Sequence, residues 1–274
     1  MPFYDTREGH ALRYLDEGAG RPVMFIHGVG SRLEGWDSVL SHLSPTRRHI
    51  RLDLRGHGES DRVPGPYTLC GMAQDVIDLA DRLGLERFTL AGFSLGGLIA
   101  QHIALDHSDR LDAIAIVSSV AGRTPEERKR VQARRDALHA SDPLEQLANS
   151  VDRWFSPEFV AANPDLIAAR RADALRNDPA CFLAAYDVLT ANDFDQRLSE
   201  IAIPALIITG EHDIGSNARM ARLMHERIAE SELHILPGLK HSILLEAPAL
   251  VALRLGAFLE RTEANQSTGG HLAT

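Results

Sequence analysis

The five residues Gly92-Phe93-Ser94-Leu95-Gly96 stand between a short apolar run and a helix-like stretch. The run Phe88–Ala91 predicts a strand, and residues 97–105 predict a helix. A strand that turns abruptly into a helix holds its central residue in strained backbone geometry, and only glycine two positions away on either side leaves room. This pattern is typical of a nucleophile elbow, so Ser94 is the candidate covalent nucleophile.

A serine hydroxyl is a weak nucleophile at neutral pH, and it needs a base within hydrogen-bond reach and a third group that orients the base. Asp213 follows the apolar run Ala205–Thr209, and His241 follows the run Leu233–Leu236. The carboxyl ends of strands in an open α/β sheet meet at one edge, so these side chains can converge on Ser94. Taken alone, Asp213 could be a helix N-cap and His241 a surface histidine. In the order serine, acid, histidine, they predict a catalytic triad.

The loop His27-Gly28-Val29-Gly30 follows another strand-like run, Val23–Ile26. A backbone N–H in such a loop can face a carbonyl oxygen as the oxygen gains charge, and we predict an oxyanion hole made by the amides of Val29 and Leu95. The alternative is that the glycines only make a tight turn. His27 is a candidate substrate contact, although a brace for the loop is the simpler interpretation of its position.

No metal and no cofactor are expected. The stretch from Asp53 to Asp61 contains acids and a histidine, but it is a glycine-punctuated loop without a matching ligand cluster elsewhere. The two cysteines, Cys70 and Cys181, each lack a second cysteine at ligand spacing. The stretch Gly92–Gly97 lacks the lysine of a phosphate-binding loop and the glycine spacing of a dinucleotide site.

The net charge and the apolar runs of the chain limit the classes of partner that it can bind. A formal net charge of −9 over 274 residues argues against nucleic acid or an anionic membrane as a partner, because both require a basic surface. No apolar run approaches the length of a membrane span, and the start MPFYDTREGH lacks the features of a secretory signal. We therefore expect a cytoplasmic protein that acts on a small molecule; a protein partner and the oligomeric state stay open.

Short apolar runs alternate with helix-like segments along most of the chain, which predicts an α/β fold with a mostly parallel central sheet and helices on both faces. Two further strands are expected at His49–Leu52 and Ala113–Val117. The other core helices are expected at Leu69–Leu83, Ala218–Ala229 and Pro248–Arg261.

Residues 122–195 interrupt this alternation with helical periodicity and no strand-like run, so we interpret them as a helical cap inserted into a core of residues 1–121 and 196–262. The polar tail 263–274 is expected to be disordered. The first cap helix should begin at Thr124-Pro125-Glu126-Glu127, where the sequence has a capping box with proline at the first helical position.

The cap supplies the candidate specificity residues. Most of the cations of its first helix should form a solvated face, paired with Glu126 and Glu127; they are Arg128, Lys129, Arg130, Arg134 and Arg135. A cap arginine such as Arg123, turned toward Ser94, would instead bind a substrate carboxylate and favour small acidic substrates. Trp154 is a candidate apolar wall of the pocket, with the core of the cap as the alternative.

Together these residues resemble the α/β-hydrolase superfamily over nearly the whole chain, from His27-Gly28 to His241. Within it, the chain is similar to 3-oxoadipate enol-lactonases. That similarity is carried by Gly65-Pro66-Tyr67-Thr68-Leu69 after Arg55-Gly56-His57-Gly58, by Gly96-Gly97-Leu98-Ile99-Ala100-Gln101, by Arg153-Trp154-Phe155-Ser156-Pro157, and by the stretch from Ala185 to Asp213.

The resemblance implies that Ser94 attacks a lactone carbonyl while His241 takes its proton and Asp213 steadies the imidazolium. The same stretches occur in carboxylesterases, perhydrolases and C–C bond hydrolases of vinylogous diketones, which remain alternatives. A ligand receptor that retains the triad is an alternative of another class. The chain departs from the family pattern in Ile214-Gly215-Ser216-Asn217, directly after the acid.

Overall fold

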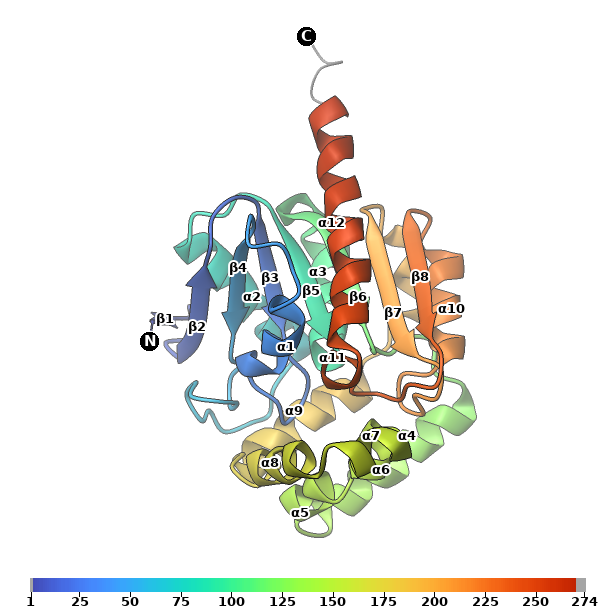
Figure 1. Cartoon of the computed structure of the whole chain (residues 1–274). Coiled ribbons are helices and arrows are strands. Elements are labelled where there is room, and N and C mark those ends of the chain that lie inside the picture. The colour runs from blue at the N-terminus through green and yellow to red at the C-terminus, as the bar shows by residue number, and fades with distance from the viewer. Residues whose placement is uncertain (1, 270–274) are drawn as a thin grey trace.

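A computed structural model describes residues 2–269 and shows an eight-stranded sheet flanked by helices, with further helices beyond one edge (Figure 1). The strand order is β1-β2-β4-β3-β5-β6-β7-β8. Strands β1 and β2 are antiparallel to their neighbours, and β4, β3, β5, β6, β7 and β8 run parallel. The strands are β1 (Phe3–Asp5), β2 (Ala11–Glu17), β3 (Pro22–Ile26), β4 (Arg48–Leu52), β5 (Phe88–Phe93), β6 (Leu111–Val117), β7 (Ala205–Gly210) and β8 (Ser231–Leu236).

The structure confirms the predicted fold class and all six strands that the apolar runs indicated. Sequence reasoning missed β1 and β2, because β2 is rich in charged residues and carries no apolar run. Its charges are accommodated by neighbouring residues: Asp16 pairs with Arg48 of β4 at 2.7 Å, and Arg13 pairs with Glu34 at 2.6 Å. Such an antiparallel strand near the sheet edge need not be continuously hydrophobic.

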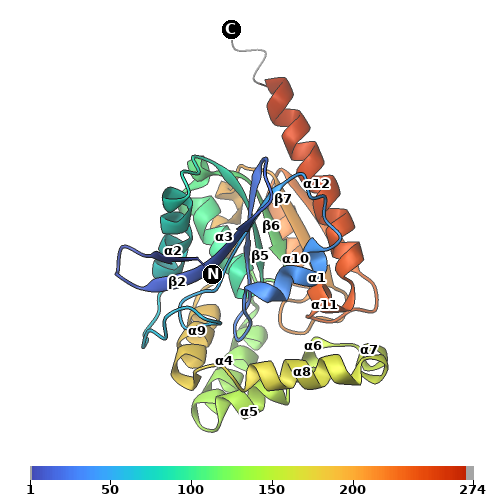
Figure 2. The same ribbon diagram turned by 60° about the vertical axis from the view of Figure 1, so that its left-hand side comes forward.

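Each face of the sheet packs against its own helices. In β7, Ala205 and Ile207 join one hydrophobic cluster, whereas Leu206 and Ile208 join the other, as the two-residue period of a strand requires. Figure 2 shows α2, α3 and α10 on one face and α1 and α12 on the other. The core helices are α1 (Asp37–Leu40), α2 (Leu69–Arg82), α3 (Leu95–Asp106), α10 (Ala218–Arg227), α11 (Ile243–Glu246) and α12 (Pro248–Gly269), with 3-10 turns η1 (Leu33–Trp36), η2 (Ser108–Arg110) and η3 (Asp195–Glu200).

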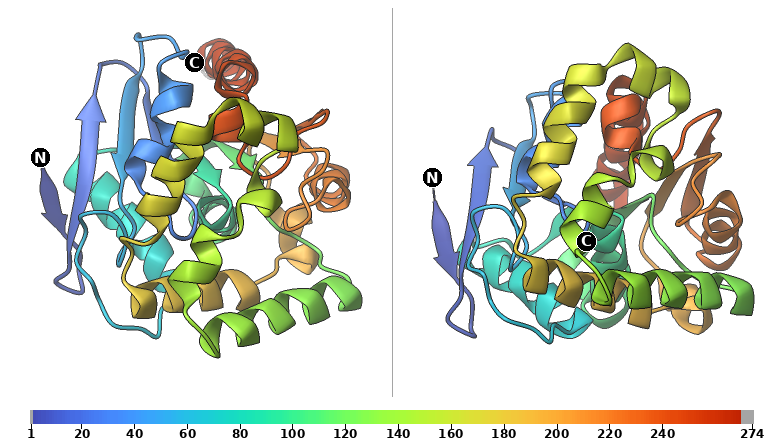
Figure 3. Two further views of the ribbon diagram at one scale, coloured as in Figure 1. Left: turned by 60° about the horizontal axis from the view of Figure 1, so that its bottom comes forward. Right: turned by 90° about the horizontal axis from the view of Figure 1, so that it is seen from below.

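Six helices inserted between β6 and β7 lie across the carboxyl ends of the parallel strands (Figures 1 and 3). They are α4 (Pro125–His139), α5 (Pro143–Ala148), α6 (Val151–Trp154), α7 (Pro157–Ala162), α8 (Pro164–Ala174) and α9 (Pro179–Ala191). The capping box predicted for α4 is present: the Thr124 hydroxyl accepts from the Glu127 amide at 3.2 Å, and the Glu127 carboxylate accepts from the Thr124 amide at 2.7 Å. These helices cover the carboxyl ends of the strands, where the loops with the predicted triad residues lie.

Helix α12 continues to Gly269, so the expectation of disorder from residue 263 is wrong for residues 263–269. Two contacts extend the helix past Arg261: the Thr262 hydroxyl donates to the Phe258 carbonyl at 3.0 Å, and the Arg47 guanidinium pairs with Glu263 at 3.0 and 3.2 Å. The rest of the predicted tail, residues 270–274, lies outside the described residues. Among the described helices, none combines the length and apolar character needed to cross a membrane.

Candidate active site

Ser94 occupies the turn between β5 and α3 and has the strained backbone that the motif predicts. Its φ of 53° and ψ of −110° place a residue with a side chain in a region that favours glycine. The end of β6 holds this conformation, since the Ser94 amide donates to the Val117 carbonyl at 2.9 Å and the Ser119 hydroxyl donates to the Ser94 carbonyl at 2.7 Å. The Ser94 side chain is therefore presented at the carboxyl edge of the sheet.

The flanking glycines are required by close backbone approaches. A Cβ atom on Gly92 would lie 2.1 Å from the Gly96 carbonyl oxygen, and one on Gly96 would lie 2.4 Å from the Ile26 carbonyl oxygen. Both distances are far shorter than any contact that a real Cβ atom makes, and both neighbours are backbone atoms that cannot rotate away. The spacing of the motif thus reflects the packing of α3 against β3 and β5.

The loops that carry Asp213 and His241 are joined by their backbones. The Glu211 amide donates to the Leu236 carbonyl at 2.9 Å, and the His212 amide donates to the Leu239 carbonyl at 2.8 Å. A Cβ atom on Gly210 would lie 2.1 Å from the Lys240 carbonyl oxygen, so glycine at the end of β7 permits this approach. Because β7 and β8 are parallel neighbours and the loops after them are hydrogen-bonded to each other, the acid lies next to the histidine.

Asp213 Oδ2 lies 2.6 Å from His241 Nδ1. The other carboxylate oxygen, Oδ1, accepts from the amides of Gly215 at 2.9 Å and Ser216 at 3.0 Å. Burial raises the pKa of Asp213, but the charge of His241 and its hydrogen bond, together with those two amides, outweigh burial and leave the pKa below its ordinary value. An ionised Asp213 fixes the proton of a neutral His241 on Nδ1, which leaves Nε2 free to accept a proton.

Ser94, Asp213 and His241 line a single cavity of about 560 Å³ between the sheet edge and the cap. The predicted oxyanion residues lie at the same place: Val29 lines the cavity, and a Cβ atom on the adjacent Gly28 would lie 3.0 Å from Ser94 Cβ. Leu95 is the first residue of α3, so its amide has no acceptor within the helix and points from the positive end of the helix dipole.

His27 braces the loop that carries Val29. Its Nε2 accepts from the Leu54 amide at 3.0 Å, and its Nδ1 lies 2.8 Å from the Gly28 carbonyl oxygen. Burial lowers the pKa of His27 to about 4, so the ring is neutral at pH 7. Because backbone groups engage both ring nitrogens, the structure supports the brace and not the substrate contact.

Residues 21–248 match the family model described as the alpha/beta hydrolase fold. The chain belongs to this family and is a hydrolase. Over 260 residues it is 28% identical to 3-oxoadipate enol-lactonase 2 of Acinetobacter baylyi, covering 93% of this chain and 96% of the relative. A second protein of that species, (E)-2-((N-methylformamido)methylene)succinate hydrolase, is 28% identical over 253 residues, with 91% and 94% covered. The enol-lactonase structure from Burkholderia xenovorans superposes with a TM-score of 0.87 at 26% identity, covering 94% of this chain and all of the other.

In this α/β hydrolase, Arg123 lines the cavity, but its guanidinium is used in hydrogen bonds within the cap. Its Nη1 donates to the Asn192 carbonyl at 2.8 Å and its Nη2 donates to the Leu189 carbonyl at 2.9 Å, both at the end of α9. Burial lowers the pKa of Arg123. Trp154 lines the cavity and also packs against two hydrophobic clusters of the cap, so both interpretations of it hold in part.

The ion pairs of α4 differ from those expected. Glu127 pairs with Arg219 of α10 and accepts from Asn217, so it links the cap to the core. Arg128 pairs with Asp193 at 3.1 Å and Arg135 pairs with Asp187 at 2.6 Å, both outside α4. The charged residues of this helix therefore bind neighbouring segments more than they bind one another.

Sequence reasoning also missed functional candidates in the cap. Arg134, Arg153 and Tyr186 line the cavity with the triad residues, although Arg134 was expected on a solvated face. The sequence does carry a signal for Arg134, because Val131 and Leu138 lie seven residues apart in α4 and Arg134 falls between them on the same face. Ile214 also lines the cavity and is 58% exposed, so the segment that departs from the family pattern forms part of the cavity wall.

Proposed function

We propose that this α/β hydrolase cleaves a small ester or lactone through an acyl-enzyme on Ser94. The observation that carries the proposal is the 2.6 Å contact between Asp213 and His241 in the same cavity as Ser94 on its strained turn. A nucleophile, a base and a group that orients the base are the three parts that activation of a serine hydroxyl needs.

In the proposed mechanism, His241 Nε2 takes the proton of Ser94 as Oγ attacks the substrate carbonyl. The tetrahedral oxyanion accepts hydrogen bonds from the amides of Val29 and Leu95, each of which contributes about two to three powers of ten in rate. His241 then gives the proton to the departing oxygen, which stays attached to the acyl chain when the substrate is a lactone. A water deprotonated by His241 hydrolyses the acyl-enzyme and releases Ser94.

The similarity to enol-lactonases favours a lactone whose ring opens to an enolate. Resonance stabilises that leaving group, so acylation is easy and deacylation carries more of the barrier. The names of the two relatives refer to oxoadipate and succinate derivatives, which supports a small, carboxylated substrate. A lactone gives one product and C–C cleavage of a diketone gives two, so product analysis separates these reactions.

The test follows the loss of enol-lactone absorbance with the wild-type protein, beside a simple aryl acetate. Ser94→Ala should lower kcat by about 10³-fold or more for both substrates while the circular dichroism spectrum stays unchanged. Ser41→Ala, which alters an exposed serine near α1, is the matched control and should retain wild-type rates. Activity of Ser94→Ala within tenfold of wild type would overturn the covalent mechanism. Turnover of the aryl acetate alone would support the triad mechanism and exclude the enol-lactone as the substrate.

A further inference from the structure

The charged residues that line the catalytic cavity carry an excess of positive charge; they are Arg123, Glu127, Arg130, Arg134, Arg153 and Asp213. Both carboxylates already have cationic or hydrogen-bonding partners, Glu127 with Arg219 and Asp213 with His241. The Nη atoms of Arg123 serve backbone carbonyls, and Arg130 is exposed to solvent. Arg134 and Arg153 are half-buried, and neither forms an ion pair with a carboxylate among the side chains that the structure describes.

The backbone that carries Arg153 is bonded to the loop that carries the proposed base, His241. Arg153 lies in α6 between two residues whose carbonyls accept hydrogen bonds from the neighbours of His241: Lys240 Nζ donates to Asp152, and the Ser242 amide donates to Trp154 at 2.9 Å. The same segment is bonded again where the Ser156 amide donates to the Glu246 carboxylate at 3.2 Å. The cap segment that carries Arg153 therefore moves with the loop that carries His241.

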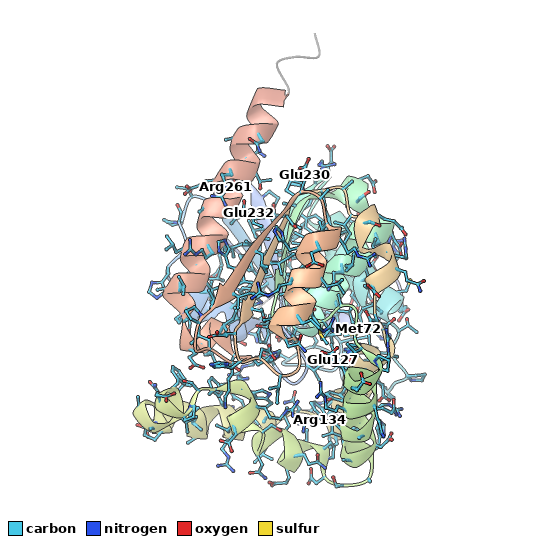
Figure 4. The ribbon with its side chains drawn as sticks, turned by 90° about the vertical axis from the view of Figure 1, so that its right-hand side faces the viewer. Met72, Glu127, Arg134, Glu230, Glu232 and Arg261 are labelled. Atoms are coloured by element: carbon cyan, nitrogen blue, oxygen red, sulfur yellow. The ribbon has the colours of Figure 1, made fainter. Side chains whose placement is uncertain are left out.

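Arg134 reaches the same part of the cavity from α4. Its Nη2 donates to the Ser150 hydroxyl at 2.8 Å, and Ser150 in turn donates to the Gln146 carbonyl at 2.6 Å, which orients the guanidinium. Figure 4 shows the Arg134 side chain on the side of α4 that faces the other cap helices. Both arginines also line a groove on the outer side of the cap, so they stand at the boundary between the cavity and that groove.

The two guanidinium groups are close enough to affect each other. Burial lowers the pKa of Arg153 and the like charge of Arg134 lowers it further, whereas Tyr186 and Asp213 act in the opposite direction. Burial raises the pKa of Tyr186, and Arg134 and Arg153 counter that rise. Two like charges in a partly desolvated site are unfavourable unless an anion joins them, and a carboxylate matches the planar fork of a guanidinium.

We propose that Arg153, with Arg134 beside it, binds a non-reacting carboxylate of the substrate and so selects anionic esters or lactones over neutral ones of the same size. This inference rests on the proposed function, since it concerns the same cavity. It also replaces Arg123 as the anion-binding arginine. Because the backbone around Arg153 is bonded to the segment around His241, binding of the carboxylate would help to place the scissile carbonyl near the base.

The test compares two aryl esters that differ in one charge: mono-(4-nitrophenyl) glutarate and its carboxamide analogue, 4-nitrophenyl 4-carbamoylbutanoate. The wild-type protein should prefer the carboxylate in kcat/KM by about ten- to a hundredfold, as expected for a charge-assisted contact. Arg153→Gln should abolish most of that preference and Arg134→Gln should reduce it, mainly through KM. Lys129→Gln, an exposed residue of α4, removes the same charge outside the cavity and should leave the preference intact.

Two results separate this inference from the proposed function. Equal kcat/KM for the two esters, with turnover that requires Ser94, would overturn carboxylate recognition and leave the serine hydrolase standing. If neither ester is turned over, binding still decides: calorimetry should show glutarate binding to Ser94→Ala about tenfold or more tightly than to Ser94→Ala combined with Arg153→Gln. Equal glutarate binding by the two variants would overturn the role of Arg153 whatever the reaction.

Discussion

Replacing Asp213 by asparagine changes one heavy atom of the candidate active site and tests how His241 is oriented. The amides of Gly215 and Ser216 both donate to Oδ1, so an oxygen must stay at that position in the variant. The new NH₂ group is then forced to face His241 Nδ1, where Oδ2 lies 2.6 Å away in the wild type. An NH₂ donor requires an unprotonated Nδ1, which places the proton of neutral His241 on Nε2 and removes the base.

The expected loss has two parts. The charge-assisted hydrogen bond that the imidazolium Nδ1–H donates to Asp213 contributes about 1.5–3 kcal/mol, which corresponds to about a ten- to hundredfold change in rate. The wrong tautomer lowers the rate further, so we expect kcat for a simple aryl acetate to fall by about 10³- to 10⁴-fold at neutral pH. Because the exchange is nearly isosteric, the thermal unfolding midpoint is the check that the site is intact.

Asp5→Asn, which alters an exposed carboxylate in β1, is the matched control and should keep the wild-type kcat. A fall smaller than tenfold in Asp213→Asn, with an unchanged unfolding midpoint, would refute this account of the site. It would mean that His241 keeps its reactive tautomer without the carboxylate, or that another group acts as the base.

Three further predictions concern stability. Gly92→Ala should destabilise the protein by more than about 3 kcal/mol or prevent folding, because its Cβ would lie 2.1 Å from the Gly96 carbonyl oxygen. Thermal unfolding measures this loss of stability, and a midpoint equal to that of the wild type would contradict the prediction. Gly256→Ala should instead stabilise α12 by about 0.5–1 kcal/mol, because its Cβ makes only an ordinary contact of 3.6 Å with Leu43. Burial lowers the pKa of His27 from 6.5 to about 4, so only the unfolded chain takes up its proton as the pH falls through 6.5. Acidification from pH 7 to pH 5 should therefore cost about 2 kcal/mol through this residue, and urea unfolding of His27→Gln should show a shallower pH dependence; an unchanged slope would refute the assignment.

Much of the fold could be predicted because the strands of a buried parallel sheet are continuously apolar. The runs in β3, β5, β6 and β7 are largely apolar and buried, whereas β4 and the edge strand β8 also contain charged residues and are partly exposed. Each run is visible without knowledge of its neighbours. The charged strand β2 was not predicted because its partners Arg48 and Glu34 lie far along the chain. The end of α12 was not predicted for the same reason, since Glu263 pairs with Arg47.

The candidate triad could be predicted for a different reason. The glycines around Ser94 identify it as the candidate nucleophile. Asp213 and His241 follow neighbouring strands of the sheet, which brings their loops together. Which arginine faces the cavity could not be predicted in this way. Val131 and Leu138 mark the covered face of α4, and Arg134 lies on that face, but the sequence of the helix does not show what covers it.

Local sequence patterns were enough to indicate the strained turn at Ser94, the strands that precede the candidate acid and histidine, and the start of α4 at its capping box. The capping box depends on hydrogen bonds between residues close together in the chain, whereas the turn at Ser94 shows itself in a local glycine spacing but is held by Ile26 and Val117 of neighbouring strands. Packing between distant segments makes His27 a brace for its loop, directs Arg123 to backbone carbonyls, and places Arg134 and Arg153 in the cavity with the candidate triad. A side chain's partners depend on which distant segments pack around it, and no pattern within one helix or loop specifies them.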